Sequence, residues 1–254
     1  MVQETLFPPP RADLGALEIA GYYEPASEVG GDWWSYSKIG DHVYLWIGDA
    51  TGHGAGAALI TSAAKSAAGL IESLGFTPGQ ALSALNRSIS DVSRGKVMMT
   101  FFLGKLNVKT LELTYSNASH EPPFLFRRKE GPYKKKDIEF LDQVNNPRLG
   151  QSRDSVYKEI RIQLAPGDTL FFYTDGVPDI RNASNEPWGE REFIKTLLAS
   201  MNVSPSPSEI LGHFSETFQV YRQGSTLADD LTFFIVKNKE DQIHEVKSNE
   251  QVSV

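Results

Sequence analysis

The chain has 254 residues, of which 40% are hydrophobic, so it can bury a sizeable core, and we expect one large folded domain. Its formal net charge of -7 argues against binding to nucleic acid or to an anionic membrane, because both carry charge of the same sign. The absence of cysteine excludes disulfides, zinc–thiolate sites and every mechanism that needs a cysteine nucleophile.

The N-terminus has neither the basic region nor the apolar segment of a secretion signal, which predicts a cytoplasmic location. We expect residues 1–16 to be a linker, residues 17–236 to form the domain and residues 237–254 to be a flexible tail. The most membrane-like stretch, Gly54–Ile71, carries Lys65 near its centre, which would be costly in hydrocarbon. It is predicted to be a buried helix without membrane contact.

Strand-forming residues open the domain. Leu17–Glu24 is rich in them, and His42–Asp49 follows a Gly40-Asp41 turn, so we expect two strands that pair as neighbours. Trp33 and Trp34 stand between these strands. Alternation along a strand predicts that one of the two indoles is buried in the core and the other is partly exposed.

Two helices are expected next. The first covers about Ala55–Leu74, and the second is opened by the sequence TPGQ. In that sequence Thr77 can cap the helix, Pro78 suits its first position and Gln80 completes a capping box. The small residues of the first helix would let it lie close against a sheet.

A strand-rich block, a second helix pair and a final strand complete the expected elements. The block contains TFFLGKLNV, LELTYS, FLFRR, YKEIRIQL and TLFFYTD, which are predicted to form antiparallel strands. Helices are expected over Glu190–Met201 and from Ser206 to about Arg222, and a last strand over Leu231–Val236. Strands at both ends of a chain with two helix pairs predict an α+β layered sandwich.

Carboxylates stand at strand ends, beside glycine or another acid, in the segments VGGDWW, IGDATGHG, FYTDGV and LADDLTFF. If these strands belong to two facing sheets, their ends can converge on one edge and gather the carboxylates in one pocket. Like charges at such distances need a counter-ion, and Mg²⁺ or Mn²⁺ prefers oxygen ligands. The small residues after Asp49 would let the Ala50 carbonyl approach the ion as well. For each aspartate taken alone, an ordinary cap or turn is the favoured interpretation, and only the four segments together indicate a metal site.

The segments EPASEVGGDWW, IGDATGHGAGAAL, YSNASHEPP, LAPGDTLFFYTDGV and ADDLT follow one another in the chain. This ordered set resembles the metal-dependent protein phosphatase (PPM) superfamily, specifically its bacterial SpoIIE/RsbU-like branch of serine phosphatases. The resemblance covers roughly Leu17–Val236. It implies a layered α-β-β-α sandwich, in which helix pairs flank two mostly antiparallel sheets, with two Mn²⁺ or Mg²⁺ ions at one edge.

The resemblance also implies an activity and its partners. The activity is hydrolysis of phosphoserine or phosphothreonine on a regulatory protein, such as an anti-sigma-factor antagonist, by water that the ions activate. An upstream sensor domain is implied as well, because VQETLFPPP is similar to the segment that joins such domains to a sensor. Residues 2–14 are then expected to pack against the first helix pair and tune metal affinity, and an inert linker is the alternative.

The resemblance carries ligand roles to six positions, namely Asp32, Asp49, Ala50, Asp175, Asp229 and Asp230. Asp49 matches the catalytic carboxylate that bridges both ions, and Ala50 matches the carbonyl ligand. Asp32 matches an acidic position that ligates directly or through water. Asp230 is either a neighbour of the ligand Asp229 or its alternative, and both assignments stay open.

The source of the proton for the leaving group also stays open at this point. It is either a water on the ions or a histidine, and His53 and His120 are the histidines inside motifs. Two departures from the family pattern lie near the site, since Ser119 stands where glycine is usual and Pro178-Asp179 where a glutamate is common. Neither departure removes an expected ligand.

Two other functions are compatible with the same residues. The domain could be a non-catalytic, metal-bound signalling module that binds a phosphorylated partner. It could also be a metal-dependent hydrolase of nucleotides or small phosphoesters, which shares the chemistry and differs only in its substrate.

Overall fold

The structure is a computed structural model and describes residues 6–52 and 54–239. Its helices are α1 (Ala55–Ser73), α2 (Pro78–Ser93), α3 (Gly189–Val203) and α4 (Pro207–Arg222), with a short 3-10 turn at Lys135–Asp137. Its strands are β1 (Arg11–Asp13), β2 (Leu17–Glu24), β3 (Asp32–Ile39), β4 (His42–Ala50), β5 (Met99–Asn107), β6 (Glu112–Ala118), β7 (Phe124–Phe126), β8 (Ile138–Phe140), β9 (Ile160–Gln163), β10 (Thr169–Tyr173) and β11 (Leu231–Asn238).

The strands form two antiparallel sheets. One has the order β1-β2-β11-β10-β7-β8 and the other β3-β4-β5-β6-β9. The expectation that Leu17–Glu24 pairs with His42–Asp49 is therefore wrong. The Gly40-Asp41 turn instead joins β4 to β3 in a hairpin in which Ile39 faces His42, and β2 pairs with β1 and β11 in the other sheet.

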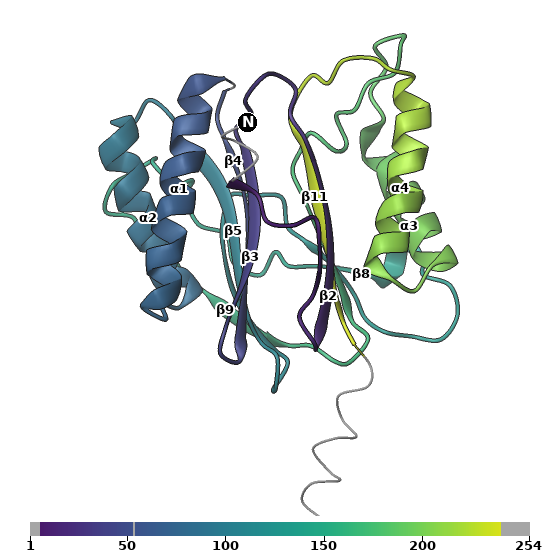
Figure 1. Ribbon diagram of the computed structural model, residues 1–254, viewed down its shortest axis with the longest axis horizontal. Helices are drawn as coiled ribbons and strands as arrows, with labels where there is room; N and C mark the ends of the chain where they lie inside the picture. The colour runs from purple at the N-terminus through teal and green to yellow at the C-terminus, as the bar shows by residue number, and fades with distance from the viewer. Residues whose placement is uncertain (1–5, 53, 240–254) are drawn as a thin grey trace, which may run out of the picture.

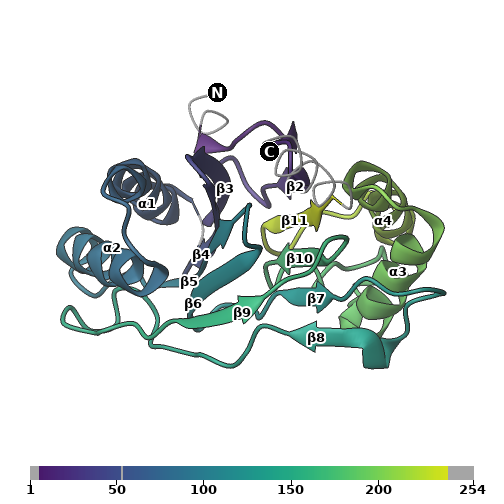
Figure 2. The same ribbon diagram turned by 90° about the horizontal axis from the view of Figure 1, so that it is seen from below.

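Four layers are visible from two directions (Figures 1 and 2). Helices α1 and α2 cover the outer face of the five-stranded sheet, and α3 and α4 cover that of the six-stranded sheet. The expected α-β-β-α sandwich is thus confirmed. Apolar side chains fill all three interfaces between the layers, so strands of both sheets are buried on both faces.

Burial on both faces corrects the expectation for the paired tryptophans. Trp33 packs under α1 and α2, while Trp34 points between the sheets, and their exposed fractions are 0% and 2%. Alternation does send the two indoles to opposite faces. Neither is exposed, because a layer of side chains covers each face.

Local signals mark the helix starts as expected. The backbone N–H of Thr77 donates to Gln80 Oε1 at 3.0 Å in front of Pro78, which begins α2. Ser206 Oγ accepts from the backbone N–H of Glu209 at 3.3 Å in front of α4. Such caps satisfy backbone N–H groups that the first helical turn leaves without partners.

The ends of the described chain also pack on the domain. Phe7 stacks on Tyr23 with ring centroids 3.9 Å apart, and Trp33 Nε1 donates to the Leu6 carbonyl at 3.0 Å. Part of the expected linker thus lies beside the edge of β3, and β1 joins the six-stranded sheet. No helix in the described residues is long and apolar enough to span a bilayer.

Candidate metal centre

Four strand ends meet at one edge of the sandwich, at the top of Figure 1. Strands β3 and β11 begin there, and β4 and β10 end there, because neighbouring strands run in opposite directions. The expected carboxylates lie on or directly beside these ends. We call this set the acidic centre, and its members are Asp32, Asp49, Asp175, Asp229 and Asp230.

Asp32 is the buried member that joins the two sheets. Its Oδ2 accepts hydrogen bonds from the hydroxyls of Thr174 at 2.8 Å and Thr232 at 2.5 Å, both from the opposite sheet. Burial, followed by the charge of Asp49 directly across the β3–β4 ladder, raises the pKa of Asp32 well above its usual range. Sequence reasoning missed both threonines, although Thr174 directly precedes Asp175 and Thr232 stands two residues after Asp230 in the quoted segments.

Asp49 is the member of the acidic centre on which the charges of three others act. Burial raises its pKa to about 8, and the charges of Asp175, Asp229 and Asp230 act in the same direction. The positive charge of Arg148 opposes them. The pKa of Asp175 is also raised, by burial and then by Asp229 and Asp179. Carboxylates that raise one another's pKa in this way are stabilised by a bound cation.

Asp230 has a different role from its neighbour. Its Oδ1 accepts the backbone N–H of Ala26 at 2.8 Å, and its Oδ2 accepts those of Gly31 at 2.6 Å and Asp32 at 3.3 Å. Asp229 is exposed, and its Oδ1 accepts the backbone N–H of Asp230 at 2.8 Å. Buried Asp230 thus ties the loop between β2 and β3 to the start of β11, whereas Asp229 faces solvent.

Glycines allow these segments to approach one another. A Cβ on Gly176 would overlap the carbonyl oxygen of Asp230, and one on Gly31 would lie 2.7 Å from the carbonyl oxygen of Ala50. Real Cβ atoms do not approach oxygen so closely. Both glycines of the motifs are therefore needed for close packing of the backbone around the acidic centre.

A cavity of about 290 Å³ opens at the acidic centre. Asp49, Ala50, Asp229 and Asp230 are among its lining residues, and Asp32 and Asp175 are not. Among the described residues, no three acidic or histidine side chains converge closely enough to form a finished metal site. The donors are nevertheless all hard oxygens, and their mutual repulsion is what a divalent cation would relieve, so the residues fit Mg²⁺ or Mn²⁺.

The two motif histidines have different outcomes. His120 is buried; its Nδ1 lies 2.9 Å from Thr100 Oγ1, and Asn117 holds its backbone with bonds of 2.8 and 2.9 Å. Burial lowers its pKa to about 3, so the ring is neutral at pH 7. Ser119, one residue earlier, has a left-handed φ of 57°, which explains why glycine is usual there. His53 lies outside the described residues.

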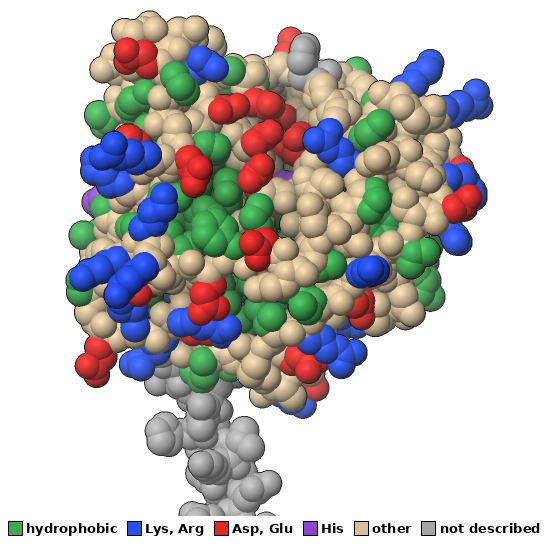
Figure 3. All heavy atoms as spheres, turned by 180° about the vertical axis from the view of Figure 1, so that it is seen from behind, with side chains coloured by type: hydrophobic (Ala, Val, Ile, Leu, Met, Phe, Trp, Pro, Cys, Tyr) green, Lys and Arg blue, Asp and Glu red, His purple; other side chains and the backbone are tan. Residues whose placement is uncertain are grey.

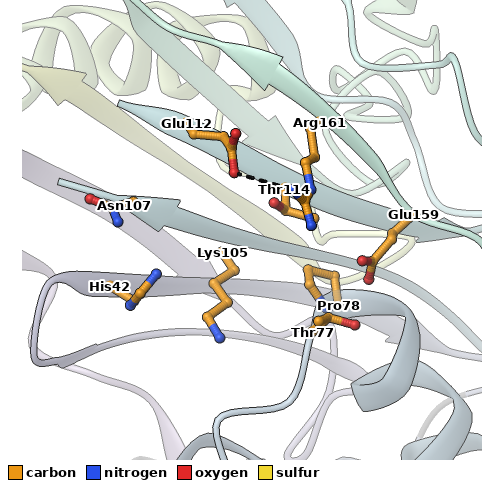
Figure 4. A pocket seen from close by; sticks show the side chains of 9 residues that line it. All are labelled: His42, Thr77, Pro78, Lys105, Asn107, Glu112, Thr114, Glu159 and Arg161. Atoms are coloured by element: carbon orange, nitrogen blue, oxygen red, sulfur yellow. Dashed lines mark ion pairs between the residues drawn. The ribbon is translucent and has the colours of Figure 1, made fainter. Parts of the chain in front are cut away.

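A second pocket lies at the opposite end of the five-stranded sheet, at the start of β4 and the end of β5 (Figure 4). Its polar groups are engaged by the fold. Lys105 Nζ donates to the carbonyls of Gly75 and Phe76, and Glu159 accepts the backbone N–H of Gly79 at 2.8 Å. These contacts help to hold α1 and α2 on the sheet, and the pocket is separate from the acidic centre.

Two antiparallel sheets between helix pairs, with carboxylates gathered at one edge, define the class of metal-dependent, PP2C-type protein phosphatases, which are hydrolases. A family model described as Stage II sporulation protein E (SpoIIE) matches residues 39–239, and the chain belongs to this family. The phosphoserine phosphatase RsbU of Bacillus subtilis (strain 168) is 28% identical over 238 residues, covering 94% of this chain and 68% of RsbU.

Solved structures agree with this fold. The SiaA-PP2C domain of Pseudomonas aeruginosa superposes with a TM-score of 0.71 at 23% identity, covering 86% of this chain and 85% of that one. The RsbU and RsbW domains of Rv1364c from Mycobacterium tuberculosis superpose with a TM-score of 0.70 at 26% identity, covering 88% of this chain and 60% of that one. The chain thus spans only part of some of its longer relatives.

Proposed function

We propose that this chain hydrolyses phosphoserine or phosphothreonine on a regulatory protein, using two Mn²⁺ or Mg²⁺ ions at the acidic centre. The observation that carries the proposal is the convergence of carboxylates from four strand ends, where the charges of neighbouring aspartates raise the pKa of Asp32, Asp49 and Asp175. When bound, such ions supply the positive charge that activates water and neutralises the phosphoryl oxygens.

The residues divide into ligands and supports. Asp49 would be the central ligand, since the charges of Asp175, Asp229 and Asp230 all act on it. Asp175, Asp229 and the Ala50 carbonyl would complete the ligand set. Asp32, whose Oδ2 is held by two threonine hydroxyls, would act through water or through its other oxygen.

Asp229 is the proposed ligand, and Asp230 the proposed positioning residue. Asp230→Asn is expected to lower the free energy of unfolding by about 1–3 kcal/mol. The amide NH₂ that replaces Oδ2 cannot accept hydrogen bonds from the backbone N–H groups of Gly31 and Asp32. Asp229→Asn, at an exposed position, is expected to leave stability within about 0.5 kcal/mol and to weaken Mn²⁺ binding. Denaturant unfolding and calorimetric Mn²⁺ titration of both variants measure these effects. The reverse pattern would make Asp230 the ligand.

His120 is proposed to position a loop and not to donate a proton, because it is buried and neutral. Donation to the leaving oxygen is then left to solvent at the centre or to His53. The protein substrate is proposed from the name of RsbU as a phosphoserine phosphatase. A phosphorylated anti-sigma-factor antagonist and an upstream sensor remain predictions from the resemblance, and a cytoplasmic location remains a prediction from the N-terminal sequence.

A substrate comparison tests the proposed function. Phosphate release is measured from a phosphoserine peptide, a phosphoserine protein and a small aryl phosphate, each with and without Mn²⁺. The proposal expects Mn²⁺-dependent release with the highest kcat/KM on the phosphoprotein. Preference for the small ester would indicate a phosphoesterase, and binding of the peptide without any release would indicate a non-catalytic module.

A further inference from the structure

The loop that joins β8 to β9 brings an arginine to the edge of the acidic centre. Leu149 and Met99 exchange both backbone hydrogen bonds, at 3.0 and 2.9 Å, so the loop adds one residue pair to β5 on its β6 side, beyond the last β5–β6 pair. On its other edge, β5 pairs with β4, where Met99 faces Ala50. Arg148, next to Leu149, is therefore two strands away from the end of β4.

Alternation determines which face Arg148 occupies. Leu149, Met99 and Ala50 all pack in the apolar layer under α1 and α2. Their neighbours in register, Arg148, Thr100 and Asp49, therefore lie on the opposite face, which is the face of the acidic centre. Since strands are 4.7–4.9 Å apart, the Cα atoms of Arg148 and Asp49 are separated by roughly 10 Å.

The backbone under Arg148 is rigid. Its carbonyl accepts the Tyr157 hydroxyl at 3.3 Å, and the following Gly150 N–H donates to Asn86 Oδ1 at 2.8 Å. Asn86 is fully buried in α2 and also donates to the carbonyls of Ser152 and Arg153. This support fixes where the Arg148 backbone lies beside the acidic centre.

The guanidinium of Arg148 forms no ion pair within the described residues. The side chain is exposed, and within residues 6–52 and 54–239 no carboxylate lies within ion-pair distance of its guanidinium. Its field does reach Asp49, whose pKa it lowers. Lys65, by comparison, is engaged, since its Nζ donates to Ser35 and lies over the Trp33 ring. Figure 3 shows acidic side chains gathered near the top of one face with a basic side chain beside them.

We propose that Arg148 binds the phosphoryl group of the substrate, and the phosphate product, on the β5 side of Asp49. A guanidinium presents paired N–H donors that match two oxygens of a phosphate, and it stays charged at every working pH. The inference rests on the proposed function. A phosphoryl group held there would lie beside the carboxylates while its charge is partly neutralised by Arg148.

The test combines turnover with phosphate binding. Arg148→Ala and Arg148→Lys are compared with wild type for kcat and KM on a phosphoserine peptide, and for binding of inorganic phosphate to the Mn²⁺-loaded protein by calorimetry. We expect Arg148→Ala to raise both KM and the phosphate Kd by about 10- to 100-fold, as for loss of a charged hydrogen-bonded pair. Arg148→Lys is expected to lie between, because an ammonium lacks the paired donors. The Mn²⁺ concentration for half-maximal activity is expected to change far less than KM or the phosphate Kd, because Arg148 has the smallest of the effects on Asp49.

Arg153→Ala is the matched control. Arg153 lies on the same loop, and its Nε donates to Asp91 Oδ1 at 2.8 Å on the surface, so this variant is expected to match wild type. Unchanged KM and phosphate Kd in Arg148→Ala would overturn the inference. A shifted Mn²⁺ requirement with unchanged phosphate Kd would also overturn it, since Arg148 would then only balance charge. Absence of turnover in wild type would count against the proposed function alone, because phosphate binding is measured independently.

Discussion

Removal of divalent cations is expected to lower phosphate release from a phosphoserine substrate by about 10³-fold or more. Ions at such a centre contribute several kcal/mol to the barrier, and each 1.36 kcal/mol corresponds to a factor of ten. The protein is stripped with chelator, dialysed and titrated with Mn²⁺ or Mg²⁺ while initial rates are recorded. Activity is expected to return with the added ion, since the chain has no cysteine that could offer a thiol-based route without metal.

Thermal unfolding gives a second readout that does not depend on turnover. An ion that binds the folded state at 100 times its Kd adds about 2.7 kcal/mol, which corresponds to a rise in midpoint of roughly 5–10 °C for a domain of this size. The same titration on Asp175→Asn, which lacks one proposed ligand, is expected to give a smaller rise. Full turnover in excess chelator, after complete removal of bound metal, would refute metal dependence.

Local signals in the sequence were sufficient for most elements. The Gly40-Asp41 turn and the capping box at Thr77 and Gln80 depend on neighbours within four residues, and both form as predicted. The convergence of the aspartates was also predictable. In antiparallel sheets an acid at the end of one strand and an acid just before another can lie at the same edge, which applies to Asp49 and Asp230.

Sheet membership was not predictable from the same signals. Side chains of both sheets are buried on both faces, so alternation looks alike in β2 and β4 and does not tell which sheet each joins. The pairing error and the error at Trp33 and Trp34 have this one cause. The register that decides it comes from β11, which is more than 200 residues from β2.

Several site contacts also depend on distant segments. Asp230 and Asp229 are adjacent and chemically identical, and only the backbone of residues 26–32 distinguishes them in the fold. Thr174 and Thr232 reach Asp32 from the opposite sheet. Arg148 reaches the centre through a single bridge to β5. Spacing within a motif carries no information about such partners.

Asp49→Asn is expected to leave a folded protein whose turnover is lower by about 10³-fold. The substitution keeps the shape of the side chain but removes the charge of the central proposed ligand, which would cost several kcal/mol in the transition state. Initial rates at saturating Mn²⁺ and a circular dichroism spectrum check both parts. Normal turnover by the variant would refute the assignment of Asp49 as the central ligand.

The same variant tests the electrostatics of the metal-free centre through pH. In the folded protein the pKa of Asp49 is raised to about 8, whereas an unfolded aspartate ionises near 3.9. Between these values the folded state binds the proton more tightly than the unfolded state, so the stability of chelated wild type falls as pH rises. Asparagine cannot ionise, so the variant loses no stability at position 49 as the pH rises. The unfolding midpoint of Asp49→Asn relative to wild type, measured in chelator, is therefore expected to increase steadily from pH 4 to pH 8. A constant difference across that range would mean that Asp49 is ionised without penalty and that the acidic centre has no need of a cation.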